Sequence, residues 1–273
     1  MSTEEVSHEE SAWAAYLLSF GSIILTLLLL LSTWFRARRK PRTIGIFHPY
    51  CDAGGGGERV LFCAIKYLPS DYRIVVYTGD SNLNGILDRC LERFGPGSTP
   101  DRNRVEFIKL KSRNLVEAST WPRFTLLGQS LGSIVLGFEA LYLLTPEVYL
   151  DTMGYAFTYP LARFLCGSKV GCYVHYPTIS TDMLNRVIER RPSYNNDARV
   201  TSSSTASYLK YSYYLAFSYL YRFVGMCAQV VMVNSSWTKN HIDYLWKTNA
   251  KLVFPPCLTS NLPAGKITKP LFF

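Results

Sequence analysis

The sequence lacks the residue spacings that mark several common classes of site. Its 7 cysteines are an odd, scattered set without a C-x-x-C pair, which argues against a zinc or disulfide framework and indicates reduced, mostly buried thiols. It has no G-x-x-x-x-G-K-[ST] run, so a P-loop nucleotide site is excluded. It also has no dense Lys/Arg block interleaved with aromatic residues, and nucleic acid is therefore not an expected partner despite the formal charge of +9.

An uncharged apolar run does occur, over residues 13–35. A helix of this length, at about 1.5 Å per residue, crosses a hydrocarbon core about 30 Å thick. No Lys or Arg precedes the run, whereas basic residues follow it directly: Arg36, Arg38, Arg39, Lys40 and Arg42. The positive-inside rule predicts a single-pass helix with residues 1–12 in the lumen and the rest in the cytosol. The length of the run, its acidic N-terminal flank and the lack of an A-x-A site argue against a cleaved signal peptide.

Beyond Pro41, short β-branched runs alternate with amphipathic stretches, which predicts an α/β domain with a mainly parallel sheet over residues 36–257. We expect strands over residues 43–48, 73–78, 105–110, 147–151, 170–175, 229–234 and 251–254. We expect helices over residues 58–68, 83–94, 124–144, 157–165, 179–189, 208–226 and 236–246. The Ser- and Thr-rich residues 192–207 are expected to form a loop.

Two of the expected helices are unusually apolar. Residues 126–144 contain only Gln129 and Glu139 as strongly polar residues, which favours a buried helix over a second membrane span. Residues 208–224 combine tyrosines with Lys210 and Arg222, a composition that favours contact with a membrane surface over pure core packing.

Four glycines, Gly54, Gly55, Gly56 and Gly57, separate the first expected strand of the domain from its first helix. Glycines at such a turn let a ligand approach the backbone and leave the N–H groups of the helix N-terminus free, which favours an anion such as phosphate. A flexible turn is the alternative, although four glycines cost more chain entropy than a turn requires. The run passes directly into a Glu-Arg pair and does not fit the G-x-G-x-x-G dinucleotide fingerprint.

Longer strings make the comparison with a known family specific. They read FHPY at 47–50, AGGGGERV at 53–60, FTLLGQSLGS at 124–133, DTMGYAF at 151–157, GCYVHYPTISTD at 171–182 and VNSSWT at 233–238. In this order they resemble the dolichol-linked oligosaccharide α-1,2-mannosyltransferases of asparagine-linked glycosylation.

The resemblance implies the N-terminal, acceptor-side Rossmann-like domain of a retaining glycosyltransferase of the two-domain (GT-B) architecture. The implied reaction transfers α-1,2-linked mannose from GDP-mannose to dolichol-diphosphate-linked Man3GlcNAc2, as its fourth and fifth mannoses. It implies no cofactor and no metal. The implied location is the cytosolic face of the endoplasmic reticulum membrane, in contact with the lipid-linked oligosaccharide and with other early mannosyltransferases.

The resemblance also suggests roles for single residues of the glycine turn and of the strand that ends near residue 175. The glycine run, with Glu58 and Arg59 behind it, would line the diphosphate side of the interdomain cleft. A surface ion pair is the alternative for Arg59. His175 would lie beside the sugar undergoing transfer, and a hydrogen-bonded core histidine is the alternative.

Two carboxylates are candidates for holding an acceptor hydroxyl. They are Asp151, which ends an expected strand, and Asp182, which follows the histidine string. Asp182 has the alternative of capping a helix, and the Asn234-Ser235-Ser236 string is most simply interpreted as a helix N-cap.

The sequence departs from the family pattern near its C-terminus. The second Rossmann domain, which would bind the nucleotide and carry an E-x7-E motif, has no counterpart, and residues 258–273 follow no family pattern. Glu139 and Glu147 have the E-x7-E spacing, but they lie in the wrong domain and we regard the match as coincidence. We expect a truncated form with little activity alone. The alternative is a non-catalytic membrane-bound isoform that binds lipid-linked oligosaccharide or partner glycosyltransferases.

Overall fold

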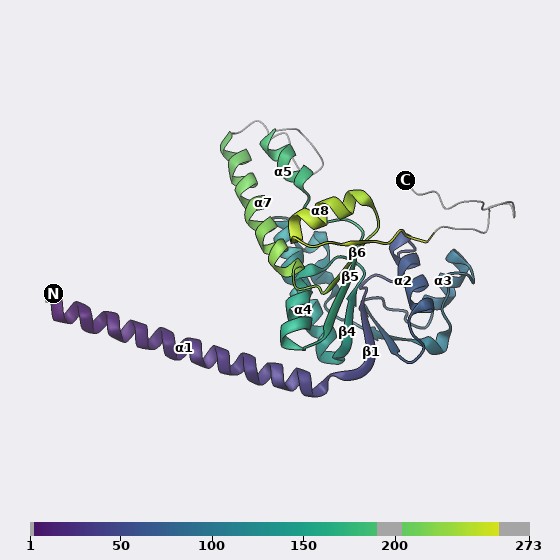
Figure 1. Ribbon diagram of the computed structural model, residues 1–273, viewed down its shortest axis with the longest axis horizontal. Helices are drawn as coiled ribbons and strands as arrows, with labels where there is room; N and C mark the ends of the chain where they lie inside the picture. Colours follow the sequence, from purple (N-terminus) through teal and green to yellow (C-terminus); the bar gives the residue numbers. More distant parts are fainter. Residues whose placement is uncertain (1–2, 190–203, 257–273) are drawn as a thin grey trace.

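A single sheet of parallel strands organises the domain in the computed structural model, which describes residues 3–189 and 204–256 (Figure 1). The strand order is β3-β2-β1-β4-β5-β6-β7. The strands are β1 Lys40–Phe47, β2 Arg73–Thr78, β3 Val105–Lys109, β4 Pro146–Asp151, β5 Lys169–Val174, β6 Val230–Val233 and β7 Lys251–Leu252. Seven strands were expected from β-branched runs, and all seven are confirmed with small shifts at their ends.

Helices cover both faces of this sheet. These helices are α2 Gly56–Tyr67, α3 Ile86–Phe94, α4 Thr125–Leu143, α5 Thr181–Ile188, α7 Ser204–Gly225 and α8 Ser236–Trp246, whereas α1 Thr3–Arg38 projects away from the sheet (Figure 1). Five short helical turns connect them: η1 Arg102–Arg104, η2 Arg113–Val116, η3 Ala118–Thr120, η4 Ala156–Thr158 and η5 Leu161–Leu165. The result is the three-layer, Rossmann-like α/β architecture predicted from the sequence.

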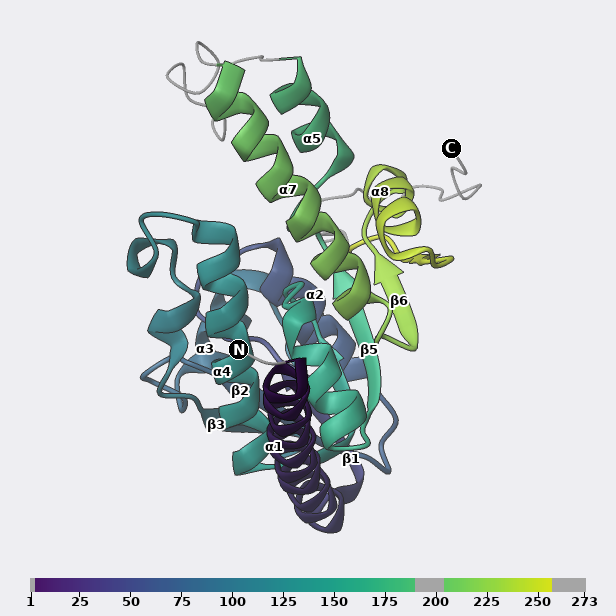
Figure 2. The same cartoon turned by 90° about the vertical axis from the view of Figure 1, so that its left-hand side faces the viewer.

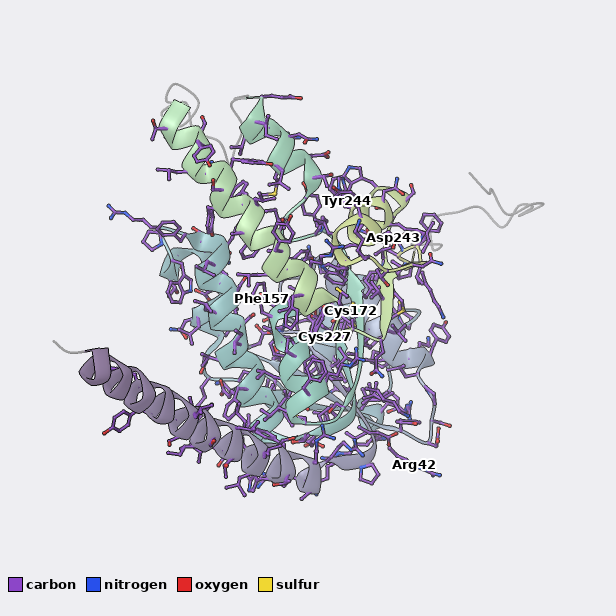
Figure 3. The ribbon with its side chains drawn as sticks, turned by 60° about the vertical axis from the view of Figure 1, so that its left-hand side comes forward. Arg42, Phe157, Cys172, Cys227, Asp243 and Tyr244 are labelled. Carbon is purple, nitrogen blue, oxygen red and sulfur yellow. The ribbon has the colours of Figure 1, made fainter. Side chains whose placement is uncertain are left out.

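Side chains that alternate along the strands divide the core into two parts. Ile46 and Val76 pack under α2 and α3, whereas Phe47, Val75 and Tyr77 pack under α4, α7 and α8 on the other face. Figure 3 shows Phe157 between α4 and α7, where its ring stacks 5.7 Å from that of Phe217. These two clusters hold the helices against the two faces of the sheet.

One expected helix is wrong. Residues 157–165 form the 3₁₀ turn η4 and the π-helical turn η5 instead of a continuous α-helix. Pro160 lies between them and has no N–H with which to continue an α-helical ladder. The expected loop falls mostly on residues 190–203, and the tail on residues 258–273, and both lie outside the described part of the chain.

The first helix extends beyond the predicted span at its N-terminal end, because α1 begins at Thr3 instead of Trp13. Residues Leu18–Arg38 form a candidate membrane span of which 6% is buried. The last turn packs on the domain, since Phe35 is fully buried and the Trp34 ring stacks on Tyr142 of α4 at 5.6 Å. Helix α4 passes the same length and composition test, but 44% of its window is buried, which agrees with the predicted core helix.

Candidate active site

Three polar residues meet near the point where the strand order of the sheet reverses. Strand β1 lies between β2 and β4, and open parallel sheets bind ligands beyond the carboxyl ends of their strands at such a point. His48 follows β1, Thr152 follows β4 and His175 follows β5, and these strands are neighbours in the sheet. The predicted site residue His175 is therefore at the expected edge.

The rings of His48 and His175 converge on the first turn of α2. A Cβ atom added to Gly57 would lie 3.7 Å from Nε2 of His175 and 4.0 Å from Cε1 of His48. Both Nε2 atoms are buried and have no hydrogen-bond partner among the described residues. Buried polar atoms are nearly always paired in proteins, so these two Nε2 atoms can each form a hydrogen bond with a group outside the described residues.

Thr152 holds this pair of rings. Its Oγ1 lies 2.7 Å from Nδ1 of the fully buried His48, and its backbone favours the protonated form of His175. His48 was missed as a site residue, although it lies in the FHPY string quoted for the resemblance. A histidine directly after the first strand of a parallel sheet was the available signal.

Burial keeps both rings neutral at physiological pH. It lowers the pKa of His48 to about 3, with a further contribution from the nearby ring of His175. It also lowers the pKa of His175, against the opposing effects of the Thr152 backbone and the Glu58 carboxylate. Neutral imidazoles exchange hydrogen bonds with hydroxyl groups but supply no fixed positive charge for phosphate.

The glycine turn is shaped for close approach. Gly54 has a positive φ of 68°, and a Cβ there would lie 2.5 Å from Nε of Arg93. Gly55 caps α2, which begins at Gly56, where an added Cβ meets nothing within 4 Å. The N–H groups of the first turn have no acceptor within the helix, so an anion is favoured there.

The two residues after the glycines have partners of their own. Glu58 is buried, and its carboxylate accepts hydrogen bonds from the N–H groups of Ala53 at 3.1 Å and Gly55 at 2.7 Å. Glu58 was expected to line the diphosphate side of the cleft. Its carboxylate instead stabilises the conformation of the glycine loop. The Arg59 guanidinium lies 5.6 Å from the ring centroid of Phe94, and no ion pair forms with it among the described residues.

Asp151 is enclosed beneath the site. Its side chain is fully buried, and its oxygens accept from Tyr159 Oη at 2.6 Å, Met153 N at 2.9 Å and Gly154 N at 3.2 Å. Burial raises the pKa of Asp151 to about 6, although these hydrogen bonds oppose the shift. Its burial argues against the predicted acceptor contact and favours a role in holding the loop after β4.

Asp182 lies at the same sheet edge but apart from the two histidines. Its side chain is 46% exposed and lies 3.5 Å from Nε2 of His241. The capping alternative for Asp182 is wrong, because Ser180 is the N-cap of α5. The predicted cap at 234–236 is confirmed: Ser235 accepts from Thr238 N at 3.2 Å.

The described residues contain no group of three or more His, Cys, Asp or Glu side chains arranged to hold a metal ion. The site as built offers neutral hydrogen-bonding rings, free helix N–H groups and close backbone approach. This arrangement suits a ligand that joins a polyhydroxyl part to an anionic part.

The chain is also similar to known proteins. The family model described as ALG11 mannosyltransferase N-terminus matches residues 41–246. A protein of Homo sapiens named GDP-Man:Man(3)GlcNAc(2)-PP-Dol alpha-1,2-mannosyltransferase is 53% identical over 226 residues, which are 80% of this chain and 45% of that protein. The protein of the same name from Mus musculus is 51% identical with the same coverage, and that from Dictyostelium discoideum is 50% identical over 78% of this chain and 44% of its own length.

The chain thus spans about 45% of the length of the relatives it matches. The matched family model covers most of the chain, including the glycine turn, His48, Thr152 and His175. A three-layer α/β domain is also consistent with this family. The chain therefore belongs to the ALG11 mannosyltransferase N-terminus family.

Proposed function

We propose that the chain supplies the acceptor-side half of a GDP-mannose-dependent retaining mannosyltransferase. The proposed reaction adds α-1,2-linked mannose to dolichol-diphosphate-linked Man3GlcNAc2, as the relatives' names state for those proteins. Because the chain spans about 45% of those relatives, the reaction is proposed for the chain together with the part of them that it does not span.

One observation carries this proposal: the Nε2 atoms of His48 and His175, which have no partner among residues 3–189 and 204–256, lie beside the free first turn of α2. A nucleotide sugar has a neutral polyhydroxyl ring joined to an anionic diphosphate. The neutral His175 ring would hydrogen-bond a sugar hydroxyl, while the N–H groups of Gly56 and Gly57 would attract the negative charge that grows on the departing diphosphate. Neither task requires a protein nucleophile or a metal.

A chimeric enzyme tests the proposed reaction. Residues 41–246 of this chain would replace the matching segment of the human relative, and the product would be assayed for transfer of labelled mannose from GDP-mannose to lipid-linked Man3GlcNAc2. We expect transfer at a rate comparable with that of the parent. A chimera that folds, binds GDP-mannose and transfers nothing would refute the proposal.

We also propose that the domain rests on the cytosolic face of the endoplasmic reticulum membrane, with α1 spanning the bilayer. The basic residues after the span support this orientation. In Figure 2 α1 points toward the viewer, and α4 and α7 lie on the same near side of the molecule.

The surface of α4 and α7 supports a second contact with the membrane. The exposed large side chains of both helices are apolar or aromatic, where a soluble helix would carry charges. On α4 they include Leu131, Val135 and Tyr142, and on α7 Tyr219, Leu220 and Phe223. The two stripes join through the Phe124 and Tyr213 rings, 5.5 Å apart.

A further inference from the structure

Three aromatic rings form a column at the sheet edge, next to His175. The Tyr176 and Trp237 rings stack with centroids 4.9 Å apart and an interplanar angle of 25°. The His241 ring meets the indole at 4.2 Å in an edge-on arrangement. Tyr176 is 60% exposed and Trp237 is 38% exposed, whereas His241 at the base is buried. The column thus presents an aromatic face to solvent.

Hydrogen bonds hold the column in place before any ligand arrives. Nδ1 of His241 lies 2.8 Å from Oγ1 of Thr181. Thr238, which follows Trp237, shares its one hydroxyl hydrogen between Oδ1 of Asn234 at 2.8 Å and the backbone carbonyl of His175 at 3.3 Å. An aromatic ring that is already ordered loses little conformational entropy on binding, so its contact area is used efficiently.

Polar groups around the column are unused within the described part of the chain. No hydrogen bond engages the Tyr176 hydroxyl or the Trp237 indole N–H among residues 3–189 and 204–256, and the half-exposed Asp182 carboxylate has only the His241 contact at 3.5 Å. A flat ring beside one donor, one hydroxyl and one carboxylate suits a neutral sugar, whose C–H face covers the ring while its hydroxyls take the hydrogen bonds. The carboxylate disfavours phosphate by charge repulsion.

We propose that Tyr176, Trp237 and Asp182 form a binding site for a neutral pyranose of the acceptor glycan. This inference rests on the proposed function, because it assigns the site to the oligosaccharide that would be extended beside His175. The site orients a sugar and takes no part in bond making.

The test uses the full chain in nanodiscs and the free glycan Man3GlcNAc2 without its lipid. Saturation-transfer NMR and calorimetry would give the dissociation constant for the chain and for Tyr176→Ala, Tyr176→Phe and Asp182→Asn. We expect Tyr176→Ala to weaken binding about tenfold, equivalent to about 1.4 kcal/mol, and Tyr176→Phe to retain most of it. Tyr244→Ala is the matched control, because Tyr244 is 62% exposed on the same helix as Trp237 and is labelled in Figure 3.

The outcomes separate this site from the proposed reaction. Equal dissociation constants for the chain, Tyr176→Ala and Asp182→Asn would overturn the site, as would a lack of glycan binding by the unmodified chain at millimolar concentration. The chimera contains the C-terminal part of the human relative, which the chain does not span. If that part covers Tyr176 and shields it from solvent, while the glycan has no effect on Tyr176, the residue forms a contact between domains and the proposed sugar site is overturned. Glycan binding that depends on Tyr176, in a chain whose chimera transfers no mannose, would support the site and refute the reaction.

Discussion

The imidazole rings of His48 and His175 both lie next to the space that a side chain on Gly57 would fill. Their nearest atoms would be 4.0 and 3.7 Å from a Cβ at that position. The two histidines are far apart in the sequence and come from strands separated by β4. The residue after β4, Thr152, hydrogen-bonds His48 through its side chain, and its backbone raises the pKa of His175.

Thr152→Val tests the support of this pair. The substitution removes the hydrogen bond between the Thr152 hydroxyl and Nδ1 of the fully buried His48, which costs about 1–3 kcal/mol of unfolding free energy, whereas Thr152→Ser keeps the hydroxyl and costs less. Denaturant unfolding in mild detergent measures both. The chain has only 4 His, so the ¹⁵N spectrum of its imidazole rings is simple. The chemical shifts of the His48 ring nitrogens should change in the valine variant and not in the serine variant. Equal effects of both variants would contradict the hydrogen bond.

Gly57→Ala should separate stability from ligand binding. Alanine favours a helix over glycine by about 0.5–1 kcal/mol, and the added Cβ makes only ordinary contacts, so the unfolding free energy should rise. The methyl group occupies the space next to both rings and should weaken sugar binding in the chimera. Gly56→Ala, whose Cβ meets nothing within 4 Å, is the control for the stability change. A Gly57→Ala enzyme with unchanged KM for GDP-mannose would show that this space is not used.

Asp151 should make stability depend on pH. Its pKa is raised to about 6 in the fold, so its contribution is present at low pH and is lost as pH rises through about 6. Asp151→Asn removes that contribution. The unfolding free energy of the chain, minus that of the variant, should therefore fall by on the order of 2 kcal/mol between pH 4.5 and 7.5. Parallel pH profiles would mean that Asp151 ionises normally.

The membrane contact of α7 is open to direct labelling. In vesicles whose lipids carry a diazirine in the acyl chain, peptides of α4 and α7 should be cross-linked as well as those of α1. Leu220→Glu combined with Phe223→Glu places charges on the exposed stripe and should remove the label from α7, because buried charge is costly in lipid. Tyr67→Glu, on the exposed side of α2, is the control. Label confined to α1 would refute the second contact.

The strands and the location of the site were predictable because both follow from local patterns. Buried parallel strands consist of β-branched runs, and a residue that directly follows such a run lies at the carboxyl edge, as His175 does. The glycine turn was recognised for the same reason: four glycines between a strand and a helix leave the helix N-terminus open.

The partners of the site residues were not predictable, because they come from distant parts of the chain. His48 bonds a threonine 104 residues away, and no sequence pattern connects the two. Asp151 ends a strand, a position from which a side chain can reach a ligand, but the Tyr159 hydroxyl donates to its carboxylate. Glu58 likewise accepts hydrogen bonds from the backbone of its own loop. These bonds depend on the local backbone geometry, which the spacing of the glycines does not reveal.

The most direct test of the central claim is the effect of His175→Ala on mannose transfer by the chimera. If His175 hydrogen-bonds the sugar undergoing transfer, kcat should fall about 100-fold or more, while the fold and GDP-mannose binding persist. The acid limb of the pH profile should lie below pH 6.5 in the unmodified chimera, because burial lowers the pKa of His175 from its usual 6.5. A His175→Ala chimera that transfers mannose with unchanged kcat would contradict the account.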